Sequence, residues 1–302
     1  MSDSISRFIL PLAILLRVIS NPLANVIQKR LTLDGHDPLL INLATYLILA
    51  VGSVVALLGQ PWPAPGWEFY LFSLLTGLTG ALGNGYLVRA LRGGDLSVLG
   101  PINAWKSVIG LLTAFLLTGE RPGRGGLPGI ALIISGSYVL LGAGGLGRRH
   151  LILRQPAIRD RVMALLLTGI QAVFDKQVIL HSNLRLAFAS WAIGGAVFAW
   201  LLLRIQPGGS PLRIAPMVRG ILGDGRSALR YLALAGSIAL MVVSTNFTFS
   251  RMAVGEALAL FQLSILLAVI FGVRIFNEGQ LVRKLGGALI MVAGSALILL
   301  AD

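Results

Sequence analysis

About ten long runs of apolar residues fill most of this chain, and they restrict its fold more than any other feature. A membrane-spanning helix needs about 20 mostly apolar residues. Charged residues make up only 12% of the 302 residues, with a mean hydropathy of +0.83, whereas soluble domains carry about 25% charged residues. The sequence therefore predicts an all-helical integral membrane protein. The expected spans are 8–28, 38–59, 67–90, 97–118, 126–146, 162–182, 186–205, 229–250, 256–276 and 282–301.

The end of each half of the chain carries the same pattern of residues. The repeated residues are Glu120, Gly129 and Gly136 and, each 158 positions later, Glu278, Gly287 and Gly294. The chain contains only four Glu, so two of them in register indicate a duplication. Because five spans per copy is an odd number, the second copy must enter the membrane in the opposite sense. We expect two inverted five-helix repeats, residues 1–147 and 148–302, forming one membrane domain around a central cavity.

The formal charge of +13 is concentrated between the apolar runs. Positive charge in such loops is typical of the cytoplasmic side of a membrane protein, so it is weak evidence for nucleic-acid binding. The two most basic segments are the join near 147–160, extending to Arg161, and the stretch 204–230. With ten spans, this asymmetry predicts that both termini lie outside the cytoplasm, in a plasma membrane of the bacterial inner-membrane type.

The inventory of reactive side chains disfavours an enzyme. The chain has no Cys and three His, which are far apart in the sequence. We therefore expect no metal site and no cofactor, and no nucleophile–base set or channel-filter motif is evident. A membrane-embedded enzyme stays the least favoured alternative.

Short motifs in both halves resemble a known family. The first half reads Ala90-Leu91, then Thr118-Gly119-Glu120 and the pair Gly129 and Gly136, and the second half has Asn277-Glu278 followed by Gly287 and Gly294. The first span ends Asn21-Pro22-Leu23-Ala24-Asn25, followed by Lys29. This pattern is similar to the ten-helix, EamA-like branch of the drug/metabolite transporter superfamily. The resemblance implies a pseudo-symmetric basket that works by alternating access, with spans one, three, four, six, eight and nine around the cavity.

Polar residues within the spans are the candidates for the site, because an ionisable group at bilayer depth is costly without a compensating role. The candidate substrate-binding residues are Arg17, Asn103, Lys106, Gln171, Asp175, Asn246 and Gln262, with Tyr86 and Trp105 as candidate cavity walls. Alternatives stay open for each of them. Arg17 and Asp175 could form an internal ion pair, Asn246 and Gln262 could be interhelical hydrogen bonds, and the two aromatic residues could simply pack. Glu120 and Glu278 are expected to cap the following helix or to form ion pairs.

The charges of these candidates favour an anionic substrate. Arg17 and Lys106 suit a carboxylate or phosphate, and Asp175 is available for an amine or for proton coupling. We expect a monomeric secondary transporter that exports an amino acid, an organic acid or a phosphorylated compound. A lipid or lipid-linked-sugar flippase and multidrug efflux are the alternatives within the superfamily.

Overall fold

The computed structural model describes residues 2–59, 64–118, 126–141, 155–205 and 223–300. Within these residues the chain forms ten apolar helical segments, two of which are broken. The helices are α1 (Ser2–Leu33), α2 (Pro38–Leu57), α3 (Trp67–Gly93), α4 (Leu96–Ile102), α5 (Trp105–Thr118), α6 (Gly126–Leu141), α8 (Pro156–Leu180), α9 (Leu184–Ile205), α11 (Gly225–Phe249), α12 (Val254–Phe261), α13 (Ser264–Phe276) and α14 (Leu281–Leu300).

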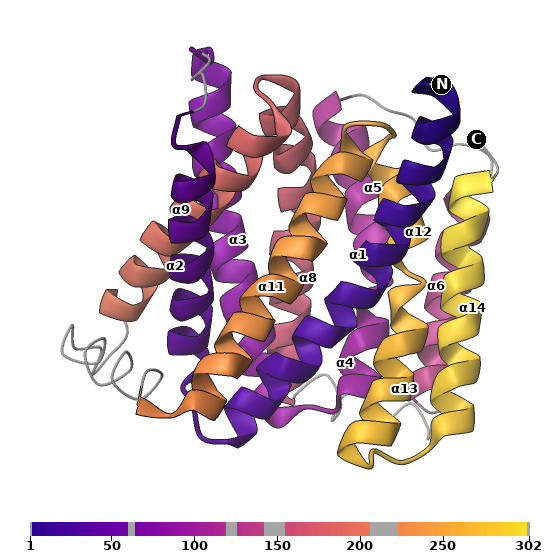
Figure 1. Ribbon diagram of the computed structural model, residues 1–302. Coiled ribbons are helices and arrows are strands. Elements are labelled where there is room, and N and C mark those ends of the chain that lie inside the picture. The colour runs from indigo at the N-terminus through magenta and orange to yellow at the C-terminus, as the bar shows by residue number, and fades with distance from the viewer. Residues whose placement is uncertain (1, 60–63, 119–125, 142–154, 206–222, 301–302) are drawn as a thin grey trace.

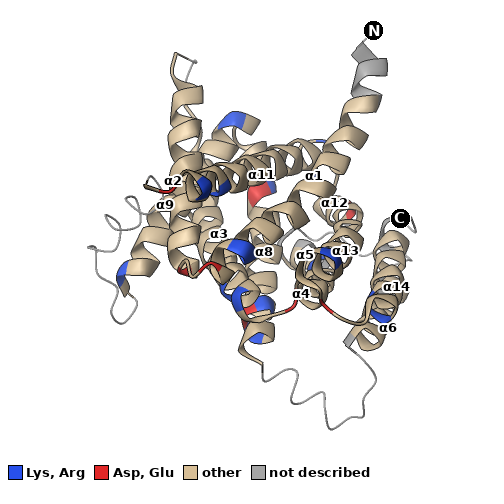
Figure 2. Ribbon diagram, turned by 60° about the horizontal axis from the view of Figure 1, so that its bottom comes forward, with Lys and Arg blue, Asp and Glu red and all other residues tan. Residues whose placement is uncertain are grey.

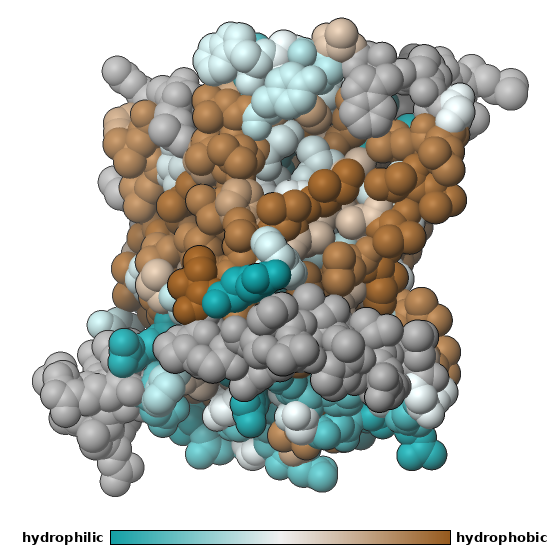
Figure 3. Space-filling model, turned by 90° about the vertical axis from the view of Figure 1, so that its left-hand side faces the viewer, coloured by the Kyte–Doolittle hydropathy of each residue, from teal (hydrophilic) through white to brown (hydrophobic). Residues whose placement is uncertain are grey.

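The helices form a single bundle suited to a bilayer. Seven of the described segments are long and apolar enough to cross a membrane, the pair α12–α13 counted as one. Both termini lie at one end of the bundle, at the top of Figure 1. Figure 3 shows a broad hydrophobic band with strongly hydrophilic residues below it, at the opposite end. Arg30, Arg92 and Arg226 lie in helix turns at this end, which we call the basic end and which comes forward in Figure 2.

The fourth and ninth segments are interrupted where the sequence predicts continuous spans. The first break, at residues 103–104, separates α4 from α5, and the second, at residues 262–263, separates α12 from α13. Pro101 in the last turn of α4 lacks a backbone N–H, which favours the first break. No proline or glycine marks the second break in the sequence. The prediction of two uninterrupted spans is corrected accordingly.

Small residues allow the closest helix contacts. A Cβ placed on Gly77 of α3 would lie 2.9 Å from the backbone of Gly194 on α9. On α14, a Cβ on Gly287 would lie 2.6 Å from the backbone nitrogen of Leu140, and one on Gly294 would lie 2.6 Å from the carbonyl oxygen of Gly129. In lipid, association of helices depends on such close packing. The glycines of the repeated motif therefore hold α6 against α14.

The motif glycines lead to a prediction about stability. Gly287→Ala should lower the thermal stability of the purified protein, because the added methyl group would overlap the backbone of α6, and overpacking typically costs about 1–3 kcal/mol. Gly286→Ala is the matched control, because a Cβ there meets no atom within 4 Å. Thermal unfolding in detergent compares the two variants. Equal stability of both would contradict the packing role of Gly287.

Candidate functional site

A cavity lies at the centre of the bundle, between α1, α2, α3, α5, α8, α9 and α11. Its volume is about 120 Å³, below the roughly 300–1,000 Å³ of pockets for drug-sized ligands. Most of its polar lining comes from amides, hydroxyls and four charged groups. The polar and charged lining residues are Arg17, Asn21, Asn25, Thr45, Tyr46, Asn84, Asn103, Lys106, Arg161, Thr168, Gln171, Asp175, Trp191, Thr245 and Asn246.

One wall is a polar stripe on α1. Arg17, Asn21 and Asn25 follow one another at intervals of four residues, so they share a helix face. The Nε of Arg17 donates to Thr245 Oγ1 at 2.8 Å, and its guanidinium lies 4.9 Å from the centre of the Phe261 ring. Only 7% of Arg17 is exposed, and its Nη1 finds no hydrogen-bond partner among the described residues. A buried donor of this kind is costly to leave unpaired, so it is ready for an acceptor on a ligand.

The break in the fourth span positions two further residues. Asn103 lies in the break and Lys106 is the second residue of α5, so both stand at the N-terminal end of a half-helix that faces the cavity. Such ends carry partial positive charge and attract anions. Gly169 allows this approach of α5 to α8, because a Cβ there would lie 2.7 Å from Ile109.

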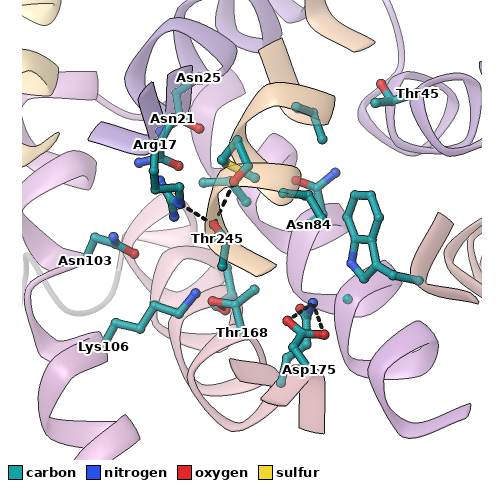
Figure 4. A pocket seen from close by; sticks show the side chains of 18 of the residues that line it. Arg17, Asn21, Asn25, Thr45, Asn84, Asn103, Lys106, Thr168, Asp175 and Thr245 are labelled. Carbon is teal, nitrogen blue, oxygen red and sulfur yellow. Dashed lines mark hydrogen bonds between the residues drawn. The ribbon is translucent and has the colours of Figure 1, made fainter. Parts of the chain in front are cut away.

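The acidic group of the cavity is on α8. Asp175 Oδ1 accepts a hydrogen bond from Thr76 at 3.0 Å, and its Oδ2 accepts one from Gln171 Nε2 at 3.1 Å. In the view of Figure 4, Asp175 lies on the far side of the cavity from Arg17. No ion pair joins these two residues among the described contacts, which disfavours the alternative that they neutralise each other directly.

The structure separates the predicted site residues into two groups. Six of them line the cavity: Arg17, Asn103, Lys106, Gln171, Asp175 and Asn246. Gln262, Trp105 and Tyr86 are not among the residues that line this cavity. Contact of any of the nine with a substrate remains a prediction.

The three outlying residues have other contacts. Gln262 is fully buried at the break in the ninth span and donates to its own helix at Leu258 O. Trp105 donates to Ser137 Oγ at 2.9 Å, which places it against α6. Tyr86 lines a separate groove of about 280 Å³ between α2, α3 and α9. The second and seventh spans take part in the cavity lining instead of the ninth.

Sequence reasoning missed several lining residues. Arg161 was interpreted as a loop charge, but it lies within α8 and is 5% exposed. The polar stripe from Arg17 to Asn25 is visible in the sequence as a spacing of four residues, and Lys29 continues it. Asn84, in contrast, stands alone among glycines and apolar residues, so nothing in the sequence singles it out.

Glu278 joins the two halves of the chain at the basic end of the bundle. Its carboxylate forms an ion pair with Lys29 Nζ at 2.7 Å and accepts hydrogen bonds from the backbone N–H groups of Leu96 and Ser97, each at 2.7 Å. The hydroxyl of Ser97 also donates a hydrogen bond to the Glu278 carboxylate, and it accepts one from Lys284 Nζ at 2.6 Å. Glu278 therefore forms an ion pair, one of its two expected roles, and it caps α4 and not the helix that follows it. Glu120, the matching residue of the first half, lies outside the described residues.

Lys29 and Lys176 make similar contacts at the starts of the two broken spans. Lys29 Nζ donates to Gly94 O at 2.9 Å, just before α4 begins. Lys176 Nζ donates to Met252 O at 3.2 Å, just before α12 begins, and also to Phe249 O. Residues 94 and 252 are 158 positions apart, the offset of the repeated motif. At the start of each broken span, therefore, a lysine donates to a backbone carbonyl oxygen.

The lining of the cavity carries a net positive charge. Among the described residues, no group of three His, Asp or Glu side chains could hold a metal ion. The cavity holds three basic and one acidic side chain, a formal excess of two positive charges. Such an arrangement attracts anions.

These features describe a multi-pass helical membrane protein with a polar central cavity, which is the architecture of many secondary transporters. Residues 9–142 match the EamA-like transporter family. These residues of the chain, 9–142, are thus similar to an EamA-like transporter domain. The resemblance noted from the sequence motifs is confirmed for this half.

The remaining comparisons concern curated proteins and the fold. None of the curated proteins matches the chain. A solved structure described as the crystal structure of a protein is 18% identical, with a TM-score of 0.63 over 99% of this chain and 98% of the other. At this identity the likeness shows a shared fold.

The contacts of Glu278 predict a pH-dependent stability. Burial raises the pKa of Glu278, but hydrogen bonds from Lys29 and Ser97 outweigh this effect and hold the pKa below its ordinary value of 4.5. The stabilisation is therefore complete above pH 4.5 and is lost as the pH falls through the lowered pKa of the folded state. Glu278→Gln should cost on the order of 3 kcal/mol at pH 7, because it leaves Lys29 buried and unpaired.

Thermal unfolding of the wild type and of Glu278→Gln between pH 3 and pH 7 measures this effect. The two curves should converge at the acid end. Glu68→Gln, in the first turn of α3, is the control and should change stability by less than about 1 kcal/mol. A constant difference between wild type and Glu278→Gln at all pH values would contradict the assignment.

Proposed function

We propose that the protein carries a small anionic or zwitterionic metabolite across the membrane by alternating access. Amino acids, organic acids and phosphorylated compounds are the candidate classes. The observation that supports this proposal most strongly is the unpaired, buried Nη1 of Arg17 in a cavity that also contains Lys106. Buried charges in proteins are paired, so a cavity of this kind is completed by an anion.

The halves of the chain supply the moving parts. We take residues 1–147 and 148–302 as the two repeats, which rock against each other about the cavity. Contacts between them include Arg17 with Thr245 and Glu278 with Lys29. Rupture of the Glu278 contacts would open the basic end. One chain holds the whole cavity, so a monomer suffices, and we place it in a bacterial-type plasma membrane, with both termini outside and export as its direction.

The other functions fit the cavity less well. A lipophilic cation would meet an excess of positive charge, which disfavours multidrug efflux. A lipid-linked sugar needs far more room than about 120 Å³. Asp175 is the one acidic group in the described lining, so coupling to protons would act through it.

Ligand-induced stabilisation tests the proposal. A ligand at 100 times its Kd stabilises the folded protein by about 2.7 kcal/mol. We expect the purified protein to gain thermal stability from members of an amino-acid or carboxylate and phosphate panel, and to gain nothing from lipophilic cations. Arg17→Gln and Lys106→Gln should each abolish the gain.

Arg204→Gln is the matched control, because Arg204 lies over Trp200 at the end of α9 and outside the cavity lining. It should respond to ligands as the wild type does. Stabilisation by cations alone, or an unchanged response in both cavity variants, would contradict the proposal.

A further inference from the structure

Arg161 is the third cation in the lining of the central cavity. It lies in the second turn of α8, is 5% exposed, and its Nε donates to Leu99 O at 2.8 Å. Leu99 belongs to α4, in the other half of the chain. Arg161 therefore links α8 to the broken fourth span.

The break explains why this carbonyl is available. In a continuous helix Leu99 O would accept from the backbone N–H of Asn103, but that N–H bonds to Gly100 O at 2.9 Å instead. The Nε of Arg161 donates to Leu99 O in place of that N–H. A guanidinium has five N–H donors, and no other hydrogen bond of Arg161 is found among the described residues. Its Nη groups are therefore available to the cavity that Arg161 lines.

The charges of the cavity do not balance. Arg17, Lys106 and Arg161 line the same cavity, and Asp175 is the one acidic residue in its described lining. Three basic groups face one acidic group, which leaves two positive charges without an anionic partner in the described lining. Desolvated charges of one sign repel strongly at low dielectric. One negative charge on a ligand would offset only half of this excess.

We propose that the cavity is built for a substrate with two negative charges, such as a dicarboxylate or a phosphate monoester, and that Arg161 binds the second charge. This inference rests on the proposed function and narrows its substrate class. Arg17 and Lys106 hold the first charge in the way described above. Arg161 adds specificity, because its Nε is fixed by Leu99 O and only its Nη groups can turn to the ligand.

Matched pairs of ligands that differ by one charge test the inference on the wild-type protein. The probes are succinate against succinamate, and methyl phosphate against dimethyl phosphate, all at pH 7.5. We expect the doubly charged member of at least one pair to bind about tenfold more tightly, a difference of about 1.4 kcal/mol. Titration calorimetry of the purified full-length protein gives each Kd, and the two pairs separate a dicarboxylate from a phosphate substrate.

Variants then assign the preference to Arg161. Arg161→Gln should bring the ratio of the two Kd values close to one while the Kd of the singly charged member stays nearly unchanged. Arg161→Lys, which keeps the charge, should retain part of the preference. Arg159→Gln is the control, because Arg159 is exposed on the same helix, and it should behave as the wild type.

The failure of this inference is distinguishable from failure of the proposed function. Equal affinity of the wild type for both members of each pair would overturn only the requirement for two charges. Unchanged selectivity in Arg161→Gln would overturn the role of Arg161. If no anion of either pair bound, and zwitterionic and monoanionic metabolites did not bind either, the proposed function would fall with it.

Discussion

Backbone groups that cannot be left unpaired in lipid set the architecture of this protein. A bilayer offers no water to an exposed N–H or C=O, so each one must find a partner within the protein. The two broken spans create several such groups. Glu278 satisfies the first N–H groups of α4, Arg161 satisfies Leu99 O, and Gln262 satisfies Leu258 O. Buried side chains stabilise the broken spans by hydrogen bonding to these backbone groups.

Two of these partners come from the opposite half of the chain, and this links the fold to transport. Glu278 joins the turn between α13 and α14 to α4, and Arg161 joins α8 to the end of α4. In the mechanism we propose, relative motion of the halves would exchange these contacts for others, and residues from both halves line the cavity. Arg161, which satisfies the backbone of α4, therefore also places a positive charge at the cavity. Structural and functional roles coincide in Arg161.

Much of the fold follows from the sequence. All ten apolar segments were expected close to their observed positions, because span length and hydropathy are dictated by the bilayer. The repeated Gly287 and Gly294 indicated a duplication, and the structure places them in the contact of α6 with α14. The breaks were not foreseen. Pro101 gives a signal for one, but no proline or glycine in the sequence marks the break at Gln262.

The site was predictable where polar residues follow helical spacing. Six of the seven expected binding residues line one cavity, and the stripe that begins at Arg17 is readable from its spacing of four. Arg161 escaped notice because it precedes the apolar run by one residue and stands among other arginines. Trp105 and Tyr86 illustrate the opposite error, because an aromatic residue beside a polar one can face a neighbouring helix.

The central claim is that water and substrate reach the cavity and that Glu278 closes its basic end. The most direct measurement uses the absence of natural Cys. Thr168→Cys, on the cavity wall, is exposed to a membrane-impermeant thiol reagent from each side of sealed vesicles, with Leu116→Cys on the lipid-facing surface as the unreactive control. The account predicts that adding Glu278→Gln increases labelling of Thr168→Cys from the basic end several-fold. Labelling of Thr168→Cys from neither side, or from the basic end at the same rate with and without Glu278→Gln, would contradict it.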